Sequence, residues 1–252
     1  MLHDLNSLLH ERQYERLEEL LDPAGFSGLI SRTVANRLAR ASRGLVVNQY
    51  HNGYPDLLVK GQYPGDAVQH GEGGLEIKAS RYPKGWQSHG PRAGWFGVVQ
   101  FRLDERADVA VHDLEPTSVQ AVLVAELTAE DWSWQPAREG RIRSGTASVR
   151  SAGVAKLRAG AVWVDPNYRT EHQRLLRDAQ AALFRNELPP LILAILREMG
   201  RAATVDDLAR QIAAPRGLDV TRTSTQVSAA VRKLQAAGQL RSEGGGRTLL
   251  LE

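Results

Sequence analysis

The sequence predicts a mixed α/β (α+β) protein in which helices flank one mixed sheet, followed by a small C-terminal module. Three observations lead to this prediction. Apolar residues recur at helical spacing in the first 41 residues, short aliphatic runs separated by turns extend to residue 127, and helical spacing returns after residue 168.

The predicted elements follow in order along the chain. Leucines at helical spacing predict a helix over 5–21 that Asp22-Pro23 ends, and a second helix covers 25–41. Aliphatic runs between turns rich in glycine and proline predict strands at 45–50, 56–61, 74–80, 97–103 and 119–127. A basic segment, a strand at 161–165 and a helix at 168–186 complete this part.

A domain boundary is predicted at Leu188-Pro189-Pro190, because a proline pair interrupts a helix and restrains the residue before it. The chain would then divide into residues 1–187 and 188–252. After the prolines, LILAILREMG is an apolar helix, Thr204 is placed as an N-cap before two acids, and TSTQVSAAVRKLQAAGQL repeats apolar residues at helical spacing. LRSEGGGRTLLLE predicts a hairpin, so the tail has three helices and then two strands.

Composition excludes several classes of protein. With 42% hydrophobic and 24% charged residues in 252, a fibrous or wholly disordered chain is not expected. The absence of cysteine excludes disulfides, thiolate zinc sites and a cysteine nucleophile. No run of about 18 apolar residues occurs and the N-terminal segment is charged, so we expect a cytoplasmic protein without a membrane span or secretory signal.

The charge of the chain indicates an anionic partner. The net charge is +3 and the pI is about 9.3, which favours nucleic acid only mildly. One basic stretch faces a single acid, Glu139, and would either track a phosphate backbone or form a solvated loop and helix face. Its cations are Arg138, Arg141, Arg143, Arg150, Lys156 and Arg158.

Two acids and a lysine are expected to converge in the predicted sheet. Glu76 and Lys78 share one face of the strand LEIKAS, and Asp56 begins the preceding strand directly after Pro55. A hairpin between these strands would bring the three side chains together. Carboxylate oxygens suit Mg²⁺ or Mn²⁺, the carbonyl of Ile77 could add a ligand, and a lysine could position the attacking water. The alternative is a solvated strand edge.

Pro55-Asp56 followed by Glu76-Ile77-Lys78 resembles the PD-(D/E)xK nuclease superfamily, over roughly residues 45 to 103. The resemblance implies a restriction-endonuclease-like fold and metal-dependent hydrolysis of phosphodiesters. It assigns Asp56, Glu76 and Lys78 to catalysis, and Asp56, Glu76 and the carbonyl of Ile77 to Mg²⁺, with Mn²⁺ as a substitute.

Members of this superfamily usually add an acid from the helix before the aspartate strand, and here that helix has none. Candidates one helix earlier are Glu15, Glu18 and Glu19, with solvated surface acids as the alternative. Some members carry a glutamine after the lysine, a place that Gln100 could take. His51, His70 and His89 lie in loops around the motif, where they would be proton shuttles or ordinary surface residues.

Residues 188–252 resemble a winged helix, whose third helix would enter the major groove. The DNA-binding residues implied at the start of that helix are Arg222, Thr223, Ser224, Thr225 and Gln226, with Arg232 and Lys233 further along and Arg241 and Arg247 beside the wing. Winged helices also serve as protein-docking modules. The loop ASRYPKGWQSHGPRAGWFG would either lie against DNA or cap the core.

A nuclease core with a winged helix is the arrangement of a restriction-type endonuclease acting on double-stranded DNA. It loosely resembles BisI-type modification-dependent enzymes, which act on methylated cytosine, and methylation dependence stays open. Double-strand cleavage needs two active sites, so a homodimer is expected. The alternatives are a repair or junction-resolving nuclease and a non-catalytic DNA-binding regulator, in which Asp56, Glu76 and Lys78 would not converge.

Overall fold

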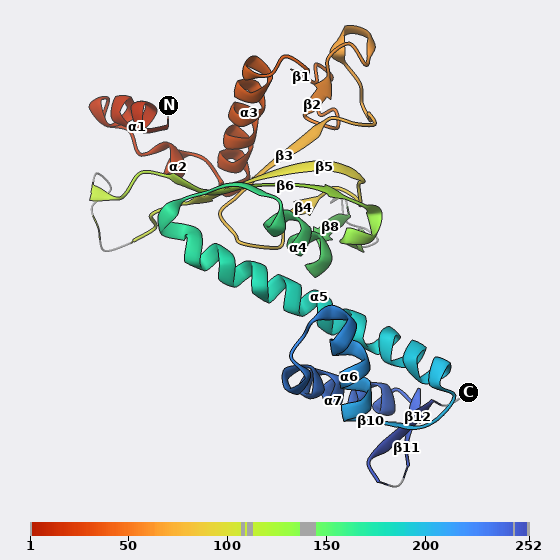
Figure 1. Ribbon diagram of the computed structural model, residues 1–252. Helices are drawn as coiled ribbons and strands as arrows, with labels where there is room; N and C mark the ends of the chain where they lie inside the picture. Colours follow the sequence, from red (N-terminus) through yellow and green to blue (C-terminus); the bar gives the residue numbers. More distant parts are fainter. Residues whose placement is uncertain (1, 107–108, 110–112, 137–144, 244, 251–252) are drawn as a thin grey trace. The chain divides into compact units, whose positions relative to one another are not determined.

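The computed structural model describes residues 2–106, 109, 113–136, 145–243 and 245–250. The chain forms two compact units, Met1–Ala179 and Gln180–Glu252, here called the first and second units. The first unit has a mixed sheet with flanking helices, which confirms the predicted mixed α/β class (Figure 1).

The main sheet of the first unit has six strands in the order β1-β2-β3-β5-β6-β9. The pair β3 and β5 is parallel, and the other neighbouring pairs are antiparallel. The strand bounds are β1 Leu45–Val47, β2 Leu57–Val59, β3 Leu75–Ser80, β5 Gly94–Arg102, β6 Ser118–Leu127 and β9 Ala161–Val164.

The two faces of this sheet are covered by different helices, α3 (Pro23–Ala41) and α4 (Ser151–Ala159), on opposite sides in Figure 1. Alternation along the strands separates two apolar cores. The core under α3 contains Phe26, Ile30, Ala35, Leu57, Ile77, Val99 and Phe101. The core under α4 contains Phe96, Val98, Leu123 and Leu157, and it also includes Trp86 and Trp132.

A smaller sheet, in the order β4-β8-β7, lies next to the core under α4. Its strands are β4 Gln87–Ser88, β8 Thr146–Val149 and β7 Trp132–Gln135. Short 3₁₀ turns occur at Pro64–Asp66, Ala129–Asp131, Pro166–Tyr168 and Ala214–Arg216.

The single N-terminal helix predicted over 5–21 is wrong. The chain forms α1 (Leu2–Glu11) and the short α2 (Leu17–Leu20) instead. Gln13 adopts a left-handed φ of 60°, which ends the first helix. The side-chain oxygen of Asn6 then accepts a hydrogen bond of 3.0 Å from the backbone N–H of Leu17, so the chain turns back on itself.

The predicted helix break at Leu188-Pro189-Pro190 is also wrong. Helix α5 runs from Arg169 to Met199 with both prolines inside it, and the units divide between Ala179 and Gln180. Proline removes a helical hydrogen-bond donor at a cost of about 3 kcal/mol. Leu188 and Ile192 are buried in the apolar core of the second unit, and this packing stabilises the helical path across the prolines.

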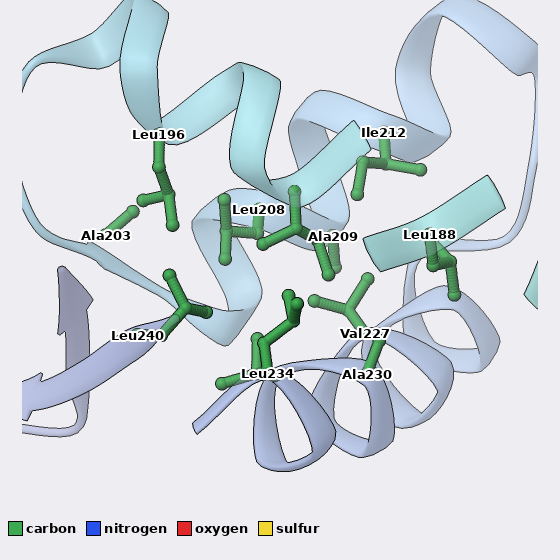
Figure 2. Close-up of a cluster of buried hydrophobic side chains, with 12 residues drawn as sticks. Leu188, Leu196, Ala203, Leu208, Ala209, Ile212, Val227, Ala230, Leu234 and Leu240 are labelled. Atoms are coloured by element: carbon green, nitrogen blue, oxygen red, sulfur yellow. The ribbon is translucent and has the colours of Figure 1, made fainter. Parts of the chain in front are cut away.

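The second unit combines the C-terminal part of α5 with α6 (Val205–Ala213), α7 (Val220–Ala236) and a three-stranded sheet. The sheet order is β10-β12-β11, with bounds β10 Ala203–Thr204, β11 Leu240–Glu243 and β12 Arg247–Leu250. The predicted hairpin is therefore confirmed, and a strand missed by sequence reasoning joins it. Figure 2 shows the apolar side chains that these elements direct toward one another.

The predicted N-cap of α6 is present in full. The Thr204 hydroxyl accepts from the Asp207 backbone N–H, while the Asp207 carboxylate accepts from the Thr204 N–H. This reciprocal pair stabilises the start of the helix by about 1 kcal/mol. Across the described parts of the chain, no helix combines the length and apolarity needed to cross a bilayer.

Candidate functional site

The turn before Asp56 is fixed by the buried side chain of Asn48, which is 5% exposed. Its amide donates to the carbonyls of Pro55 at 3.0 Å and Val68 at 2.9 Å. Its oxygen accepts from the backbone N–H groups of Tyr50 and Val68. A Cβ at Gly53 would overlap both Asn48 and Val68. All the hydrogen-bonding groups of Asn48 thus hold the loop that delivers Asp56 to β2.

Strands β2 and β3 separate just where the motif begins. They pair at Leu57 and Leu75, and beyond this point the Asp56 carboxylate accepts a 2.8 Å hydrogen bond from the N–H of Ile77. In return, the Glu76 carboxylate accepts one of 3.2 Å from the Asp56 N–H. Asp56 therefore occupies the edge of β3 that a continued strand would have filled.

Lys78 completes this group. Its ammonium lies 2.6 Å from a carboxylate oxygen of Glu76, and its side chain is 31% exposed. Asp56, Glu76 and Lys78, which span 22 positions of the sequence, are thus joined in one cluster. Two hydrogen bonds from backbone N–H groups and one ion pair connect them. The three residues therefore lie together, as expected from a hairpin between their strands.

The cluster carries more negative than positive charge. Burial, and next the charge of Glu76, raise the pKa of Asp56 from 3.8 to about 6, against the lowering effects of the Ile77 N–H and Lys78. A further cation would relieve this repulsion. The site therefore has the electrostatics of a carboxylate pair that favours an added positive charge.

The donors at this site fit a magnesium ion. Mg²⁺ usually takes one or two carboxylates and fills its remaining positions with water and phosphate oxygens. Asp56 and Glu76 supply the carboxylates. On a strand the N–H and C=O of one residue point to the same edge, so the Ile77 carbonyl lies at the edge where its N–H meets Asp56. The described ranges contain no group of three or more His, Asp or Glu side chains that could hold a metal ion by themselves.

A cavity of about 700 Å³ opens beside Asp56 and Lys78. One wall is α3 and another is the segment between β3 and β4. The polar and charged side chains that line it include Ser27, Ser31, Arg32, Tyr82, Gln87 and His89. Sequence reasoning missed Arg32, although a helix with arginines and no acid next to the motif was a signal that could have found it.

None of the three glutamates proposed as an additional ligand lies at this cavity. Glu18 accepts hydrogen bonds from Asn6 and Thr117 and pairs with Arg16. Glu18 and Glu19 line a separate cavity, and Glu15 is exposed. The chain breaks at Gln13 and Glu18 bonds to Thr117, so the structure gives no support to an additional ligand from these candidates.

Gln100 does not line the cavity either, and its side chain is hydrogen-bonded within the core. It is buried in β5, where its amide donates to Gln120 and Tyr168 and its oxygen accepts from Arg158. Among the three loop histidines, His89 lines the cavity, whereas His51 and His70 are exposed and outside the cavity lining. His89 is therefore the histidine placed for a role at the site.

The basic stretch does not form one cationic surface in the described residues. Arg158 is buried at 1% exposure, and Lys156 pairs with Asp131 at 2.7 Å. Arg150 is exposed, and Arg138, Arg141 and Arg143 lie outside the described residues. Burial of Arg158 follows from its hydrogen bonds to Gln100 and the Pro83 carbonyl. Arg158 therefore fits neither of the two alternatives for the stretch, whereas Lys156 is exposed and already paired.

The loop between β3 and β5 was expected either to lie against DNA or to cap the core, and its residues divide between buried and exposed positions. Trp86 is a core residue, and Arg92 stacks over Tyr54 at 4.2 Å from the ring centroid. Tyr82 remains exposed, Lys84 is exposed as well, and Trp95, in β5 itself, is exposed too. Arg81 bonds to the Tyr82 hydroxyl and pairs with Glu105.

On α7, most of the residues expected to contact DNA are accessible. Arg222, Thr225 and Arg232 are exposed and recur at helical spacing along one side. Lys233, Arg241 and Arg247 are exposed as well, and Gln226 is half-buried.

Two of the proposed contacts on α7 are already engaged within the second unit. Thr223 is 2% exposed and bonds to the Asp219 carbonyl, so its assignment to DNA is wrong. The Ser224 hydroxyl donates to the Asp206 carboxylate at 2.9 Å.

Comparison with known proteins adds no relative. No model of a known protein family matches the chain, and a search of curated proteins finds no match. The geometry of the site therefore carries the functional argument by itself.

Proposed function

We propose that the protein is a metal-dependent endonuclease of the restriction type that hydrolyses phosphodiester bonds of double-stranded DNA. One observation carries the proposal: Asp56, Glu76 and Lys78 form a hydrogen-bonded cluster where β2 and β3 separate, next to an open cavity. The cluster and its surrounding mixed sheet support the PD-(D/E)xK nuclease assignment.

Each residue of the cluster has a chemical role in this proposal. When bound, Mg²⁺ or Mn²⁺ would polarise the phosphodiester and lower the pKa of a coordinated water. Asp56, Glu76 and the Ile77 carbonyl would hold it. Lys78 orients the attacking water and stabilises negative charge on the phosphorus centre. The attacking water gives up one proton to solvent as its oxygen adds to phosphorus, one P–O ester bond breaks, and the leaving oxygen takes up a proton.

The second unit supports DNA recognition. Its order of helix, strand, two helices and hairpin, with the strand pairing to the hairpin, supports the proposed winged helix. The side of α7 that carries Arg222, Thr225 and Arg232 has no large apolar side chain, although Val220 is exposed at the start of the helix, and this favours a nucleic-acid contact over a protein-docking surface. Arg222, Thr225, Gln226 and Arg232 on α7, and Arg247 at the hairpin, are the proposed DNA contacts.

Cleavage of plasmid DNA tests the proposal. We expect purified protein with Mg²⁺ to produce discrete fragments, and Lys78→Ala and Asp56→Ala to lose them while Lys60→Ala, an exposed lysine near the end of β2, keeps them. Matched methylated and unmethylated plasmids decide whether cytosine methylation is required. Duplex binding without any cleavage would remove the enzyme proposal and leave a DNA-binding regulator.

The oligomeric state belongs to the same proposal. One chain offers one cluster, and two strands must be cut, so we propose a homodimer on DNA. Sedimentation with and without a duplex measures it. A monomer that cuts only one strand would instead indicate a nicking, repair or junction-resolving nuclease.

A further inference from the structure

We propose that Arg32, on the α3 wall of the cavity that Asp56 and Lys78 also line, holds the DNA backbone by binding a phosphate that neighbours the cleaved one. This proposal rests on the proposed function, because it names the part of the substrate that the cavity receives. Arg32 and Lys78 both line the cavity, and they come from different elements, α3 and β3.

The α3 wall is shaped to admit a rigid polymer. Its cavity-lining positions follow the helical series i, i+3, i+4, i+7 and i+8. They are Ala24, Ser27, Gly28, Ser31 and Arg32. The first four are small, and a Cβ built at Gly28 would meet no atom within 4 Å. The wall is therefore a flat strip of small side chains with one long cation at its end.

The charge on this wall is not neutralised within its own helix. Helix α3 contains Arg32, Arg37 and Arg40 and no acid, so ion pairs between helix neighbours cannot form there. Among the described residues Arg32 forms no ion pair, whereas other exposed arginines do, such as Arg174 with Glu171 and Asp178. An exposed arginine in this state is available to an anion in the cavity.

A phosphodiester is the anion that fits. A guanidinium binds two non-bridging phosphate oxygens in a planar, bidentate manner. The neighbouring hydroxyls of Ser27 and Ser31 add donors, although the Ser31 hydroxyl at present donates to the Ser27 carbonyl at 3.0 Å. Contacts of this kind position DNA and do not select its sequence, so Arg32 would set where the backbone lies relative to Lys78.

The salt dependence of binding provides the first test. A labelled duplex is titrated with the full-length chain in EDTA, which prevents cleavage, at several salt concentrations. We expect Arg32→Ala to reduce the slope of log K against log salt by about 0.9, the value for one lost phosphate contact. Arg32→Lys should retain the slope, and Arg37→Ala, a matched arginine outside the cavity lining, should leave it unchanged. An unchanged slope in Arg32→Ala overturns the proposal.

Disulfide crosslinking provides an independent test, because the chain contains no cysteine. Arg32→Cys and Arg37→Cys each introduce one thiol, and duplexes carry a thiol tether on one backbone phosphate at a time. We expect Arg32→Cys to crosslink at phosphates next to the cut position and Arg37→Cys not to. Equal crosslinking by both variants, or none by either, counts against the Arg32 assignment.

The two proposals fail in different ways. If wild-type protein cleaves DNA while Arg32 and Arg37 variants behave alike in both tests, only the Arg32 assignment falls. If wild-type protein never cleaves, yet Arg32→Ala loses one phosphate contact, the cavity binds nucleic acid and the nuclease proposal falls. Absence of any duplex binding overturns both.

Discussion

At the scale of single residues, Asp56 is a carboxylic acid whose ionisation is opposed by its surroundings. Burial and the charge of Glu76 raise its pKa to about 6, so the folded protein binds this proton more tightly than the unfolded chain does. Stability from this group is fully present below pH 4 and is lost as the pH rises to about 6. The direction is opposite to that of an acid in a stabilising salt bridge.

Replacement of Asp56 tests this sign. In EDTA, we expect the unfolding free energy of wild type to decrease between pH 4 and pH 6, and Asp56→Asn to lack that decrease and to be the more stable protein at pH 8. Asp178→Asn, which removes an exposed acid of α5, should keep the wild-type profile. Urea denaturation at several pH values measures both. A more stable wild type at pH 8 would contradict the assignment.

The burial of Arg158 could not be predicted from the sequence. Its position in a basic stretch allowed either a phosphate contact or a solvated helix face, but the fold buries it beside Gln100 and the Pro83 carbonyl. Its Nε atom has no hydrogen-bond partner, and burial lowers the pKa of the guanidinium. The hydrogen bonds it donates connect α4 to the segment that forms a wall of the cavity.

Loss of Arg158 should therefore affect stability more than DNA binding. We expect Arg158→Ala to lower the unfolding free energy by about 3 kcal/mol, since charged hydrogen bonds are lost and their buried acceptors are left unsatisfied. Arg150→Ala, at the exposed start of the same helix, should change it by less than about 0.5 kcal/mol. Chemical denaturation of both variants makes the comparison, and similar values would contradict the structural role.

At the scale of elements, the separation of β2 and β3 creates the site. Gly74 permits the close approach of the two strands just before they separate, because it adopts a φ of 94° and a Cβ there would overlap the Leu57 carbonyl oxygen. Sequence patterns predicted both strands and their antiparallel pairing. They did not predict that pairing stops after Leu75, since this depends on the Asp56 side chain taking the place of a backbone partner.

A pair of glycine variants isolates the effect of this close approach. Gly61 also has a left-handed φ, of 77°, but a Cβ there would meet nothing within 4 Å. We expect Gly61→Ala to cost about 1 kcal/mol from backbone strain alone. Gly74→Ala should cost more and should reduce cleavage, because β2 must move away from β3. Thermal denaturation and the plasmid assay measure both effects, and equal results for the two variants would show that contact with Leu57 is unimportant.

The sequence predicted helix boundaries correctly where a local signal, such as a capping residue, sets the end of the helix. The Thr204 cap and the limit of α3 at Ala41 agree with the structure. The continuous helix over 5–21 and the break at the prolines were wrong, because each depends on contacts with residues distant in sequence. Leu188 and Ile192 keep α5 helical through packing that no local pattern reveals.

At the scale of the whole molecule, the chain forms two units with separate cores, so the proposed cleavage and DNA binding can be tested separately. We expect Arg232→Ala on α7 to weaken duplex binding and reduce its salt slope by about 0.9, as loss of one phosphate contact requires, while kcat at saturating DNA stays near wild type. Lys78→Ala should abolish kcat and bind with nearly normal affinity. Arg197→Ala, an exposed arginine of α5, serves as the control.

Binding by anisotropy and cleavage under saturating conditions distinguish these outcomes. If Arg232→Ala lowers kcat and leaves affinity unchanged, α7 has no role in holding DNA. If Lys78→Ala lowers affinity as much as activity, its contribution is to binding and the division of roles between the units fails.

The sequence by itself determined the mixed α/β class, the strands that carry the motif and the identity of Asp56, Glu76 and Lys78 as a group to examine. The class, the strands and this group of residues can be predicted because periodicity and residue type are visible within a few neighbouring positions of the sequence. Only the tertiary structure decided which cations face the cavity. Arg32 and Arg158 are the same residue type in basic surroundings, but packing exposes the first at the cavity that Asp56 also lines and buries the second against the Trp86 ring. The physical reason is that exposure and pairing of a charge depend on all the elements around it, and those are set by contacts between distant parts of the chain.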